Sequence, residues 1–406
     1  MDRSLTLINA QIQFLNTRLA LIHIPLKLYP HFIQPILQLL ALVGVDEEDE
    51  DGLPRRPWAF SYPFANISVT TIECSIVCPR HLITELFTPI IYSLSSSAQS
   101  EISISRDDYV VIAVGGEGTE AGQRVLDLTA PLALAGISIF FITSYYSDFV
   151  LVPQKSRSTV VTALESQGFA FEPQPNGHSQ MTNISSPLHA HHHKTPHSPS
   201  LPHHHHHSRS PTTPPATSIH EWQLRTFALL RRSGIHPVLD TTLRLASAAA
   251  HRADHGTQAR LTHYITAALI SPITPRFLSL TLTDVDSLSL TMDRDLLRLF
   301  PGDSSMGFSG RAGEGSEVLL LSDEVTVPII LDLRGLPDES TGIVCGVAGR
   351  LLEAMGGGER GEWGMGFNMS YLSTAKAGNV IVREDEVGEA LEALREIEAV
   401  GGEDGG

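Results

Sequence analysis

The stretch Gly136-Ile-Ser-Ile-Phe-Phe-Ile-Thr-Ser-Tyr-Tyr-Ser-Asp-Phe-Val-Leu-Val152 decides how the rest of the chain is interpreted. Aromatic and β-branched residues stand on both sides of a short polar centre, which is the usual signal of a β-hairpin. We therefore predict a buried strand over Ile137–Ile142, a turn over Thr143–Asp148 and a return strand over Phe149–Val152.

A second copy of this pattern lies near the C-terminus, over Gly366–Val382. A shift of 230 residues (366 − 136) superposes the two copies without a gap and places Tyr371 on Phe141. In the same way, Phe277–Phe300 repeats the pattern of Phe64–Phe87. The chain therefore contains an internal duplication.

In the first half, a strand and a helix precede each hairpin and a further helix follows it. The order strand, helix, strand, strand, helix is the front of a ferredoxin-like unit. The predicted elements of the two series are Arg18–Ile24, Pro30–Val43, a hairpin from Phe64 to Cys78 and Arg80–Phe87, and then Tyr109–Val114, Glu120–Ala135, the hairpin of 137–152 and Ser156–Ser166.

The same plan restarts in the second half. Its predicted elements are a strand over Arg225–Leu230, a helix over Pro237–Ala250, the hairpin and short helix of 277–300, a strand over Val325–Leu333, a helix over Gly342–Ala354, the hairpin Phe367–Val382 and a helix over Asp385–Ala399. The predicted fold is α+β: four ferredoxin-like (βαββαβ) units in two tandem pairs, with antiparallel sheets backed by helices. The predicted units span residues 1–95, 106–171, 219–302 and 317–400.

Residues 172–218 interrupt this plan. They are dominated by His, Pro, Ser and Thr, include the tract His203–His207, and hold few apolar residues. Such a composition cannot offset the entropy of ordering, so we predict a disordered linker. Weak binding of a divalent metal by the histidines is the alternative reading.

The composition excludes several classes of partner. Lys+Arg 28 against Asp+Glu 45 gives a net charge of −17, which argues against binding to nucleic acid or to an anionic membrane. The longest apolar runs, Phe32–Val45 and Ala130–Ile142, are too short to span a bilayer. Three cysteines and a start without a signal peptide predict a cytoplasmic protein in a reducing compartment.

No motif for catalysis or metal binding is present in the sequence. There is no G-x-S-x-G, H-E-x-x-H or P-loop, and Gly115–Gly122 is predicted to be a strand-to-helix turn because it lacks a lysine and carries acids. Cys74 and Cys78 lie on one face of a predicted strand without a second ligand pair, so we predict buried thiols. We expect no catalytic residue, no metal and no cofactor, and hence a protein that is not an enzyme.

The quoted stretches resemble a known family. Gly136–Val152 with its preceding helix, and Thr341–Val344 followed by Phe367–Val382, look like the second and fourth ACT units of CASTOR-type arginine sensors, and Phe277–Phe300 is similar to the third unit. The family consists of cytosolic proteins with four ACT domains that relay arginine availability to the TOR kinase pathway. The resemblance implies a regulatory amino-acid sensor.

The resemblance also implies a ligand site between the second and fourth units. The implied residues lie on an edge strand, on the loop that opens a facing helix and on a hairpin turn. They are Ser138, Ile139, Glu339, Thr341, Gly342, Ile343, Thr374, Ala375, Ala377 and Gly378. A ligand carboxylate would meet backbone N–H groups at the helix start.

The sequence departs from the family at the fourth hairpin turn. The aspartate that the family carries there is Gly378, and its aromatic neighbours are Ala375 and Ala377. A neutral amino acid is therefore at least as consistent with the site as arginine, and a ligand-free scaffold or interaction protein is the alternative. The expected partners are a small-molecule amino acid and a protein of a signalling complex, and such units also form homodimers.

Overall fold

The computed structural model describes residues 11–43, 58–115, 121–171, 218–252, 255–271, 273–300, 318–337, 340–356 and 367–395. The predicted linker at 172–218 lies outside these ranges apart from Ser218, as does Glu339.

Within the described residues, twelve strands form one closed barrel. Each strand is hydrogen-bonded to the next, and the pairing of Leu245 with Thr326 joins the last strand to the first. In order around the barrel the strands are β10 (Leu245–Ala250), β12 (Ser289–Asp293), β11 (Leu278–Thr283), β2 (Phe64–Val69), β3 (Glu73–Pro79), β1 (Gln11–Pro25), β5 (Tyr109–Gly115), β7 (Asp148–Pro153), β6 (Phe140–Thr143), β15 (Met369–Ser373), β16 (Ala377–Arg383) and β14 (Thr326–Asp332). Short strands add to this ring: β13 (Leu319–Leu321) on β10, β9 (Pro237–Leu239) on β14, and β4 (Ser103–Ile104) and β8 (Ala170–Phe171) on β1.

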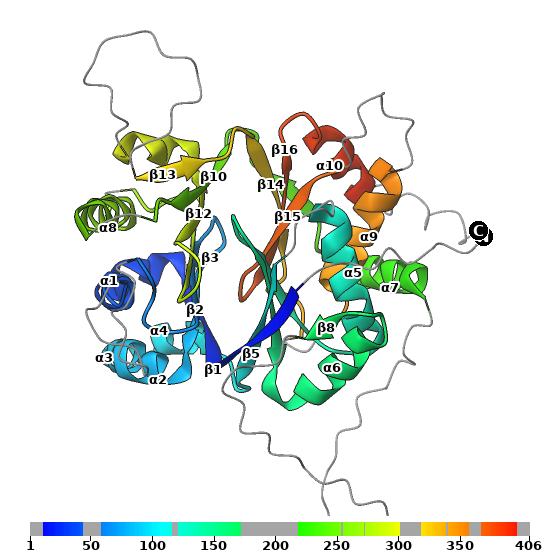
Figure 1. Cartoon of the computed structure of the whole chain (residues 1–406), viewed down its shortest axis with the longest axis horizontal. Helices are drawn as coiled ribbons and strands as arrows, with labels where there is room; N and C mark the ends of the chain where they lie inside the picture. The colour runs from blue at the N-terminus through cyan, green and yellow to red at the C-terminus, as the bar shows by residue number, and fades with distance from the viewer. Residues whose placement is uncertain are drawn as a thin grey trace, which may run out of the picture.

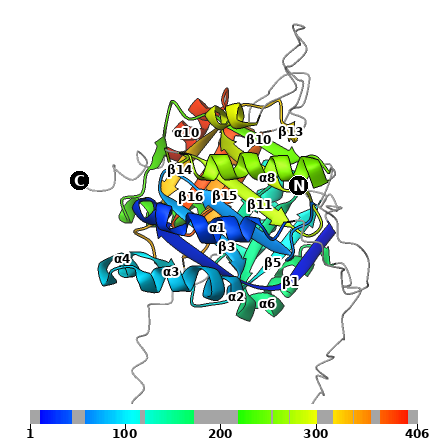
Figure 2. The ribbon, with the colours of Figure 1, turned by 90° about the vertical axis from the view of Figure 1, so that its left-hand side faces the viewer.

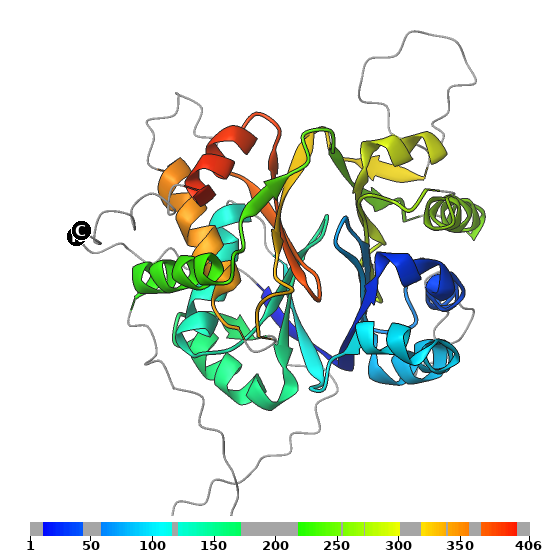
Figure 3. The ribbon, with the colours of Figure 1, turned by 180° about the vertical axis from the view of Figure 1, so that it is seen from behind.

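The helices lie outside the ring of strands, in two groups on opposite sides (Figure 1). One group contains the 3-10 helix η1 (Leu26–Phe32), α1 (Ile33–Leu40), α2 (Arg80–Leu82), the π-helical turn η2 (Ile83–Phe87), α3 (Thr88–Ser93), α4 (Ser96–Glu101), α8 (His255–Leu269) and η4 (Arg294–Leu299). The other contains α5 (Ala121–Leu134), η3 (Gln154–Ser156), α6 (Arg157–Glu165), α7 (Ile219–Arg232), α9 (Ile343–Gly356) and α10 (Val387–Arg395). Figure 2 shows α1 and α8 lying across the strands, and Figure 3 shows both groups from behind.

Side-chain alternation along the strands builds separate cores on the two faces of the barrel wall. On β2, Ile67 and its outward-facing neighbours pack beneath the first helix group, while α5 and α9 cover a second outer core. The inward-facing Phe64 belongs to a third cluster that contains no helical residue, and its ring lies 4.9 Å from that of Phe149 on the opposite wall. The interior of the barrel is therefore packed with side chains and is not a pore.

The duplicated hairpins pair with each other in a pseudo-twofold manner. β6 meets β15 at Ile142 and Leu372, which are equivalent positions under the 230-residue shift. One hydrogen bond from a backbone N–H to a side-chain hydroxyl on each side of this pair repeats the symmetry. The Phe141 N–H donates to Ser373 Oγ (2.9 Å), and the Tyr371 N–H donates to Thr143 Oγ1 (3.1 Å). The duplication read from the sequence is thus also a structural symmetry.

Two structural predictions need correction. In each quarter of the chain the two strands of the hairpin lie beside the strand that precedes the hairpin in the sequence, and this arrangement occurs four times. Strands of neighbouring quarters also pair with each other. The structure is therefore one barrel and not two tandem pairs of separate units. Closing the barrel removes the free strand edges that four separate units would expose. The α+β class is confirmed, and the unit boundaries stay predictions.

The second correction concerns the start of the second half. Arg225–Leu230, predicted as a strand, lies within helix α7, and Pro237–Ala250, predicted as a helix, forms β9 and β10. The segment Leu245–Ala250 is rich in alanine, which favours a helix locally. Pairing with β12 and β13 overrides this preference. No helix in the described part of the chain is both long and apolar enough to cross a membrane.

Candidate functional site

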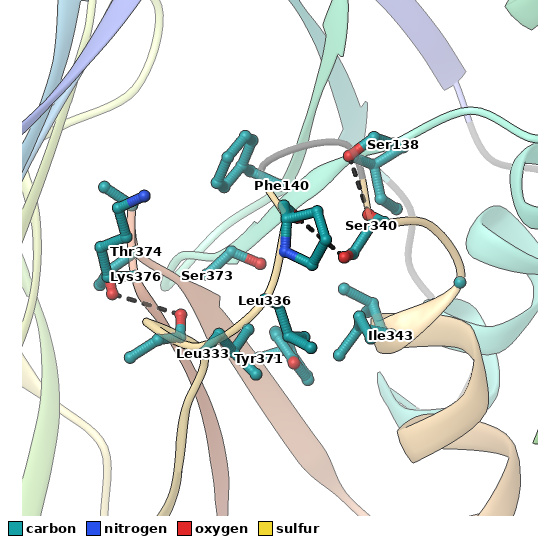
Figure 4. Close-up of a pocket in the computed structure, with 16 residues that line it drawn as sticks. Ser138, Phe140, Leu333, Leu336, Ser340, Ile343, Tyr371, Ser373, Thr374 and Lys376 are labelled. Atoms are coloured by element: carbon teal, nitrogen blue, oxygen red, sulfur yellow. Dashed lines mark hydrogen bonds between the residues drawn. The ribbon is translucent and has the colours of Figure 1, made fainter. Parts of the chain in front are cut away.

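A small pocket lies at the seam between the two copies of the duplicated hairpin (Figure 4). It encloses about 80 Å³, and its walls come from the chain before β6, the loop between β14 and α9, the start of α9, and the turn between β15 and β16. The lining residues are Ser138, Ile139, Phe140, Leu333, Leu336, Pro337, Ser340, Gly342, Ile343, Val344, Tyr371, Ser373, Thr374, Ala375, Lys376 and Ala377.

Seven of the ten residues implied by the family resemblance line this one pocket. They are Ser138, Ile139, Gly342, Ile343, Thr374, Ala375 and Ala377. Thr341 and Gly378 lie beside lining residues but do not line the pocket, and Glu339 is outside the described residues. The structure therefore brings together three segments that are far apart in the sequence, while their binding to a ligand stays a prediction.

The two walls of the seam are tied by a hydrogen bond. The hydroxyl of Ser138 donates to the backbone carbonyl of Ser340 at 3.0 Å, and Figure 4 shows this bond at the upper edge of the pocket. Ser138 is half-buried, and its oxygen keeps its lone pairs for a further acceptor role. Ser138 thus links the second quarter of the chain to the loop before α9.

Helix packing, in addition to the residue's place in the pocket, explains why residue 342 is a glycine. Its φ of +77° falls in the left-handed region that favours glycine. A Cβ at this position would lie 2.6 Å from Cε3 of Trp222 on α7. The close approach at Gly342 is therefore made by a tryptophan ring.

A nearby hydroxyl group explains why residue 378 is a glycine. A Cβ at residue 378 would lie 2.4 Å from the Oη atom of Tyr371, whose side chain is 1 % exposed. In the other copy of the hairpin the equivalent residues are Phe141, which has no hydroxyl, and Asp148. The tyrosine hydroxyl thus occupies the space that a side chain at residue 378 would need.

This packing predicts a specific compensation between Gly378 and Tyr371. Gly378→Ala should lower the free energy of unfolding by about 1–3 kcal/mol, because an added methyl group overpacks a filled site. Tyr371→Phe should restore most of that loss in the double variant, since it removes the clashing oxygen. Chemical denaturation of both single variants and the double variant measures the coupling, and additive effects would contradict it.

The polar groups of the pocket are mostly uncharged. Among the described lining residues none is acidic, and Lys376 is the one basic residue. Burial raises the pKa of the Tyr371 phenol, which therefore stays protonated at neutral pH. Ile343 and Val344 lie in the first turn of α9, where the backbone N–H groups have no acceptor within the helix. The pocket offers hydroxyls and N–H groups to a ligand, but no carboxylate in the described chain.

The turn between β15 and β16 is held from the barrel interior. The hydroxyl of Thr374 and the N–H of Lys376 both donate to Oε1 of Glu73, at 2.7 Å and 2.6 Å. The N–H of Ala375 donates to Ser75 Oγ at 3.0 Å. These donors are thus engaged with β3, so the turn shapes the wall of the pocket rather than binding a ligand through them.

Other groups that could carry chemistry lie away from the pocket. Burial raises the pKa of Cys345 to about 12 and raises the pKa values of Cys74 and Cys78 further, so the three buried cysteines are neutral thiols, as the sequence predicted for Cys74 and Cys78. Within the described ranges no cluster of His, Cys, Asp and Glu could hold a metal ion.

The sequence did not point to several lining residues, and it missed Glu73. Tyr371 and Ser373 could have been found from alternation along β15, because residues two apart share one face of a strand. Glu73 carried one signal, which is an acid at the start of a strand that is otherwise uncharged. The loop residues Leu333, Leu336 and Ser340 carried none, since their place depends on the closure of the barrel.

Comparison with known proteins identifies one domain type. Residues 104–166 match the family model described as ACT domain, so an ACT domain is present in this part of the chain. None of the curated proteins matches the sequence.

Solved structures with some likeness include aspartate kinases. Aspartate kinase from Synechocystis is 11% identical with a TM-score of 0.31, over 99% of this chain and 58% of that chain. The enzyme from Clostridium acetobutylicum is 16% identical with a TM-score of 0.26, over 41% and 36%. The ligand-free regulatory subunit of aspartate kinase from Thermus thermophilus is 16% identical with a TM-score of 0.22, over 40% and 95%. This chain thus covers little more than half of the Synechocystis enzyme, and likeness at these scores carries no weight for function.

Proposed function

We propose that this chain is a non-enzymatic regulatory protein that binds an amino acid with a small uncharged side chain in the pocket at the hairpin seam. The observation that carries the proposal is the convergence of seven implied ligand residues, from three separate segments, on one pocket. The ACT domain at residues 104–166 supports it, because this segment contains the pocket residues Ser138, Ile139 and Phe140.

The size of the pocket favours a small ligand. One water needs on the order of 10–15 Å³ of cavity volume. A pocket of about 80 Å³ therefore has room for glycine, alanine or serine and is too small for arginine without movement of its walls. The absence of an acidic side chain among the described lining residues points the same way, since a buried cation without a carboxylate partner is costly.

The ligand's two charged groups would meet different parts of the pocket. Its carboxylate would lie at the start of α9, near the N–H groups of Ile343 and Val344, because a helix N-terminus attracts anions. Its ammonium group would lie near the oxygens at the seam, which include the Ser138 hydroxyl and the Ser373 hydroxyl.

In its finer form the proposal follows the CASTOR-type sensors that the sequence resembles. The bound amino acid would stabilise one arrangement of the seam, and a protein partner in a signalling complex would recognise that arrangement. The ligand can shift the equilibrium only by its difference in affinity for the two arrangements.

Thermal unfolding of the full chain in the presence of each of the twenty amino acids tests the proposal. An amino acid that binds only the folded state should stabilise it by about 2.7 kcal/mol at a hundredfold excess over its dissociation constant. Ser138→Trp should abolish this effect by filling the pocket. Asn368→Trp is the matched control, because residue 368 is the equivalent position in the other hairpin copy and is exposed outside the pocket.

A ligand-free scaffold is the second candidate. The small volume of the pocket and the engagement of the turn donors with Glu73 and Ser75 favour it. If no amino acid at millimolar concentration shifts the unfolding midpoint of the wild-type chain, amino-acid sensing is wrong and the scaffold reading replaces it.

A further inference from the structure

Glu73 is a fully buried carboxylate that joins the two halves of the chain across the barrel. It begins β3, and its exposure is 0 %. A buried carboxylate persists when its oxygens are hydrogen-bonded and its charge is paired. The partners that satisfy it therefore show what this residue holds together.

The two carboxylate oxygens of Glu73 contact different halves of the chain. Oε2 lies 2.5 Å from Nδ1 of His23 on β1, whose side chain is 11 % exposed. Oε1 accepts from the Thr374 hydroxyl and the Lys376 N–H, about 300 residues later in the sequence. Glu73 is thus a bridge between β1 and the turn between β15 and β16.

The turn held by Glu73 is a wall of the proposed ligand pocket. Thr374, Ala375 and Lys376 all line that pocket, and Ala375 and Lys376 also line a larger cleft of about 610 Å³ beside Ile102–Asp107. A shift of this turn would therefore change the shape of both hollows at once. The position of the turn depends on acceptors from β3, which belongs to the other half of the chain.

We propose that Glu73 is a positioning residue for the pocket and couples amino-acid binding at the hairpin seam to β1 and β3 of the N-terminal half. The ligand part of this inference rests on the proposed function. Glu73 does not touch the ligand. It keeps the Thr374–Lys376 turn in the conformation that closes the pocket. A bound amino acid that presses on this turn strengthens the hydrogen bonds that the turn donates to Glu73.

The pseudo-symmetry of the barrel supplies a matched control. The shift that aligns Phe64–Phe87 with Phe277–Phe300 places Asp286 on Glu73 (286 − 73 = 213). Asp286 accepts from the Ser147 hydroxyl at 3.2 Å and so contacts the turn of the other hairpin copy. That turn does not line the pocket, and the Asp286 side chain is 26 % exposed. Asp286→Ala therefore removes the equivalent contact without touching the proposed site.

The first experiment measures amide hydrogen exchange of the full chain without any amino acid. Glu73→Ala should speed exchange at residues 374–377 by about tenfold or more, because the turn loses two buried hydrogen bonds. Asp286→Ala should leave residues 374–377 unchanged, and Glu73→Gln, which keeps an acceptor oxygen, should restore part of the protection. Unchanged exchange at 374–377 in Glu73→Ala overturns the positioning role. Should that variant fail to fold, Glu73→Gln and Ser75→Ala decide the same point.

The second experiment uses L-alanine as the probe and tests the coupling. L-Alanine should slow exchange at residues 19–25 and 73–79 of the wild-type chain, and Glu73→Ala should abolish this effect and weaken L-alanine binding about tenfold. Equal L-alanine affinity in Glu73→Ala and Asp286→Ala overturns the coupling. If the wild-type chain binds no L-alanine, the proposed function for this ligand fails together with the coupling, while the first experiment still decides whether Glu73 positions the turn.

Discussion

Arg124→Met is expected to lower the free energy of unfolding by about 3–5 kcal/mol at neutral pH, because it leaves a buried carboxylate without its partner. Arg124 on α5 forms an ion pair with Asp148 on β7, and the two side chains are 18 % and 1 % exposed. Asp148 lies on the outward face of the barrel wall, beneath α5. An unpaired charge at this site has no access to water.

The loss should shrink as the pH is lowered. Burial raises the pKa of Asp148 above its ordinary value, while the charge and hydrogen bond of Arg124 act to lower it. Because the folded state holds this proton more tightly than the unfolded state, the group favours folding most below the unfolded pKa of about 3.9 and contributes less as the pH rises through the folded pKa. Without Arg124 the folded pKa rises further, so protonation near pH 4 removes most of the cost.

Urea denaturation of the wild type and Arg124→Met between neutral pH and about pH 4 measures this difference. The double variant Arg124→Met/Asp148→Asn is the control, since it removes the charge and should recover most of the stability at neutral pH. A difference between Arg124→Met and the wild type that stays the same at both ends of the pH range would contradict the role of an unpaired Asp148.

Gly346→Ala is expected to lower the free energy of unfolding by about 2–3 kcal/mol, because α7 and α9 are packed at the distance that a glycine allows. A Cβ at residue 346 would lie 2.5 Å from Oγ1 and 2.6 Å from Cβ of Thr226. Thr226 is 2 % exposed, and its hydroxyl donates to the carbonyl of Gly342 at 3.1 Å. This β-branched side chain therefore cannot rotate away without losing a buried bond.

Two further variants make this prediction specific. Gly346→Ala/Thr226→Ala should be more stable than the sum of its single changes, because the second substitution removes the clashing atoms. Gly388→Ala on α10, where an added Cβ meets nothing within 4 Å, should instead stabilise the protein by up to about 1 kcal/mol. Thermal or urea unfolding of the three variants is the measurement, and a neutral Gly346→Ala would show that α7 is free to move.

Much of the local structure could be predicted, and the errors in helix and strand assignment lie at the start of the second half. The strong hairpin patterns at 137–152 and 367–382 became β6–β7 and β15–β16, and the amphipathic segments at 120–135 and 342–354 became α5 and α9. The failures lie at 225–250, where Arg225–Leu230 formed part of α7 and an alanine-rich segment formed β10. Alanine, leucine and arginine favour a helix, so α7 follows its local propensity. In β10 the pairing with distant strands overrode the same preference.

The residues of the candidate site also form two groups, one that could be predicted from the sequence and one that could not. Seven of the lining residues followed from the family resemblance, because the resemblance depends on short patterns within single segments. The hydroxyl of Tyr371 beside Gly378 and the carboxylate of Glu73 beneath the turn could not be predicted. Each of these depends on how two segments meet in space, and no pattern along one segment encodes that distance.

The sequence by itself determined the duplication, the α+β class and the hairpins that later form the seam, because alternation and turn residues act over a few neighbouring positions. Only the tertiary structure decided that the strands close into one barrel, since an edge strand finds its partner through hydrogen bonds to a segment far away in the chain. Barrel closure then placed Glu73 beneath the Thr374–Lys376 turn and Tyr371 against Gly378. The size and the uncharged character of the pocket are therefore properties of the assembled barrel.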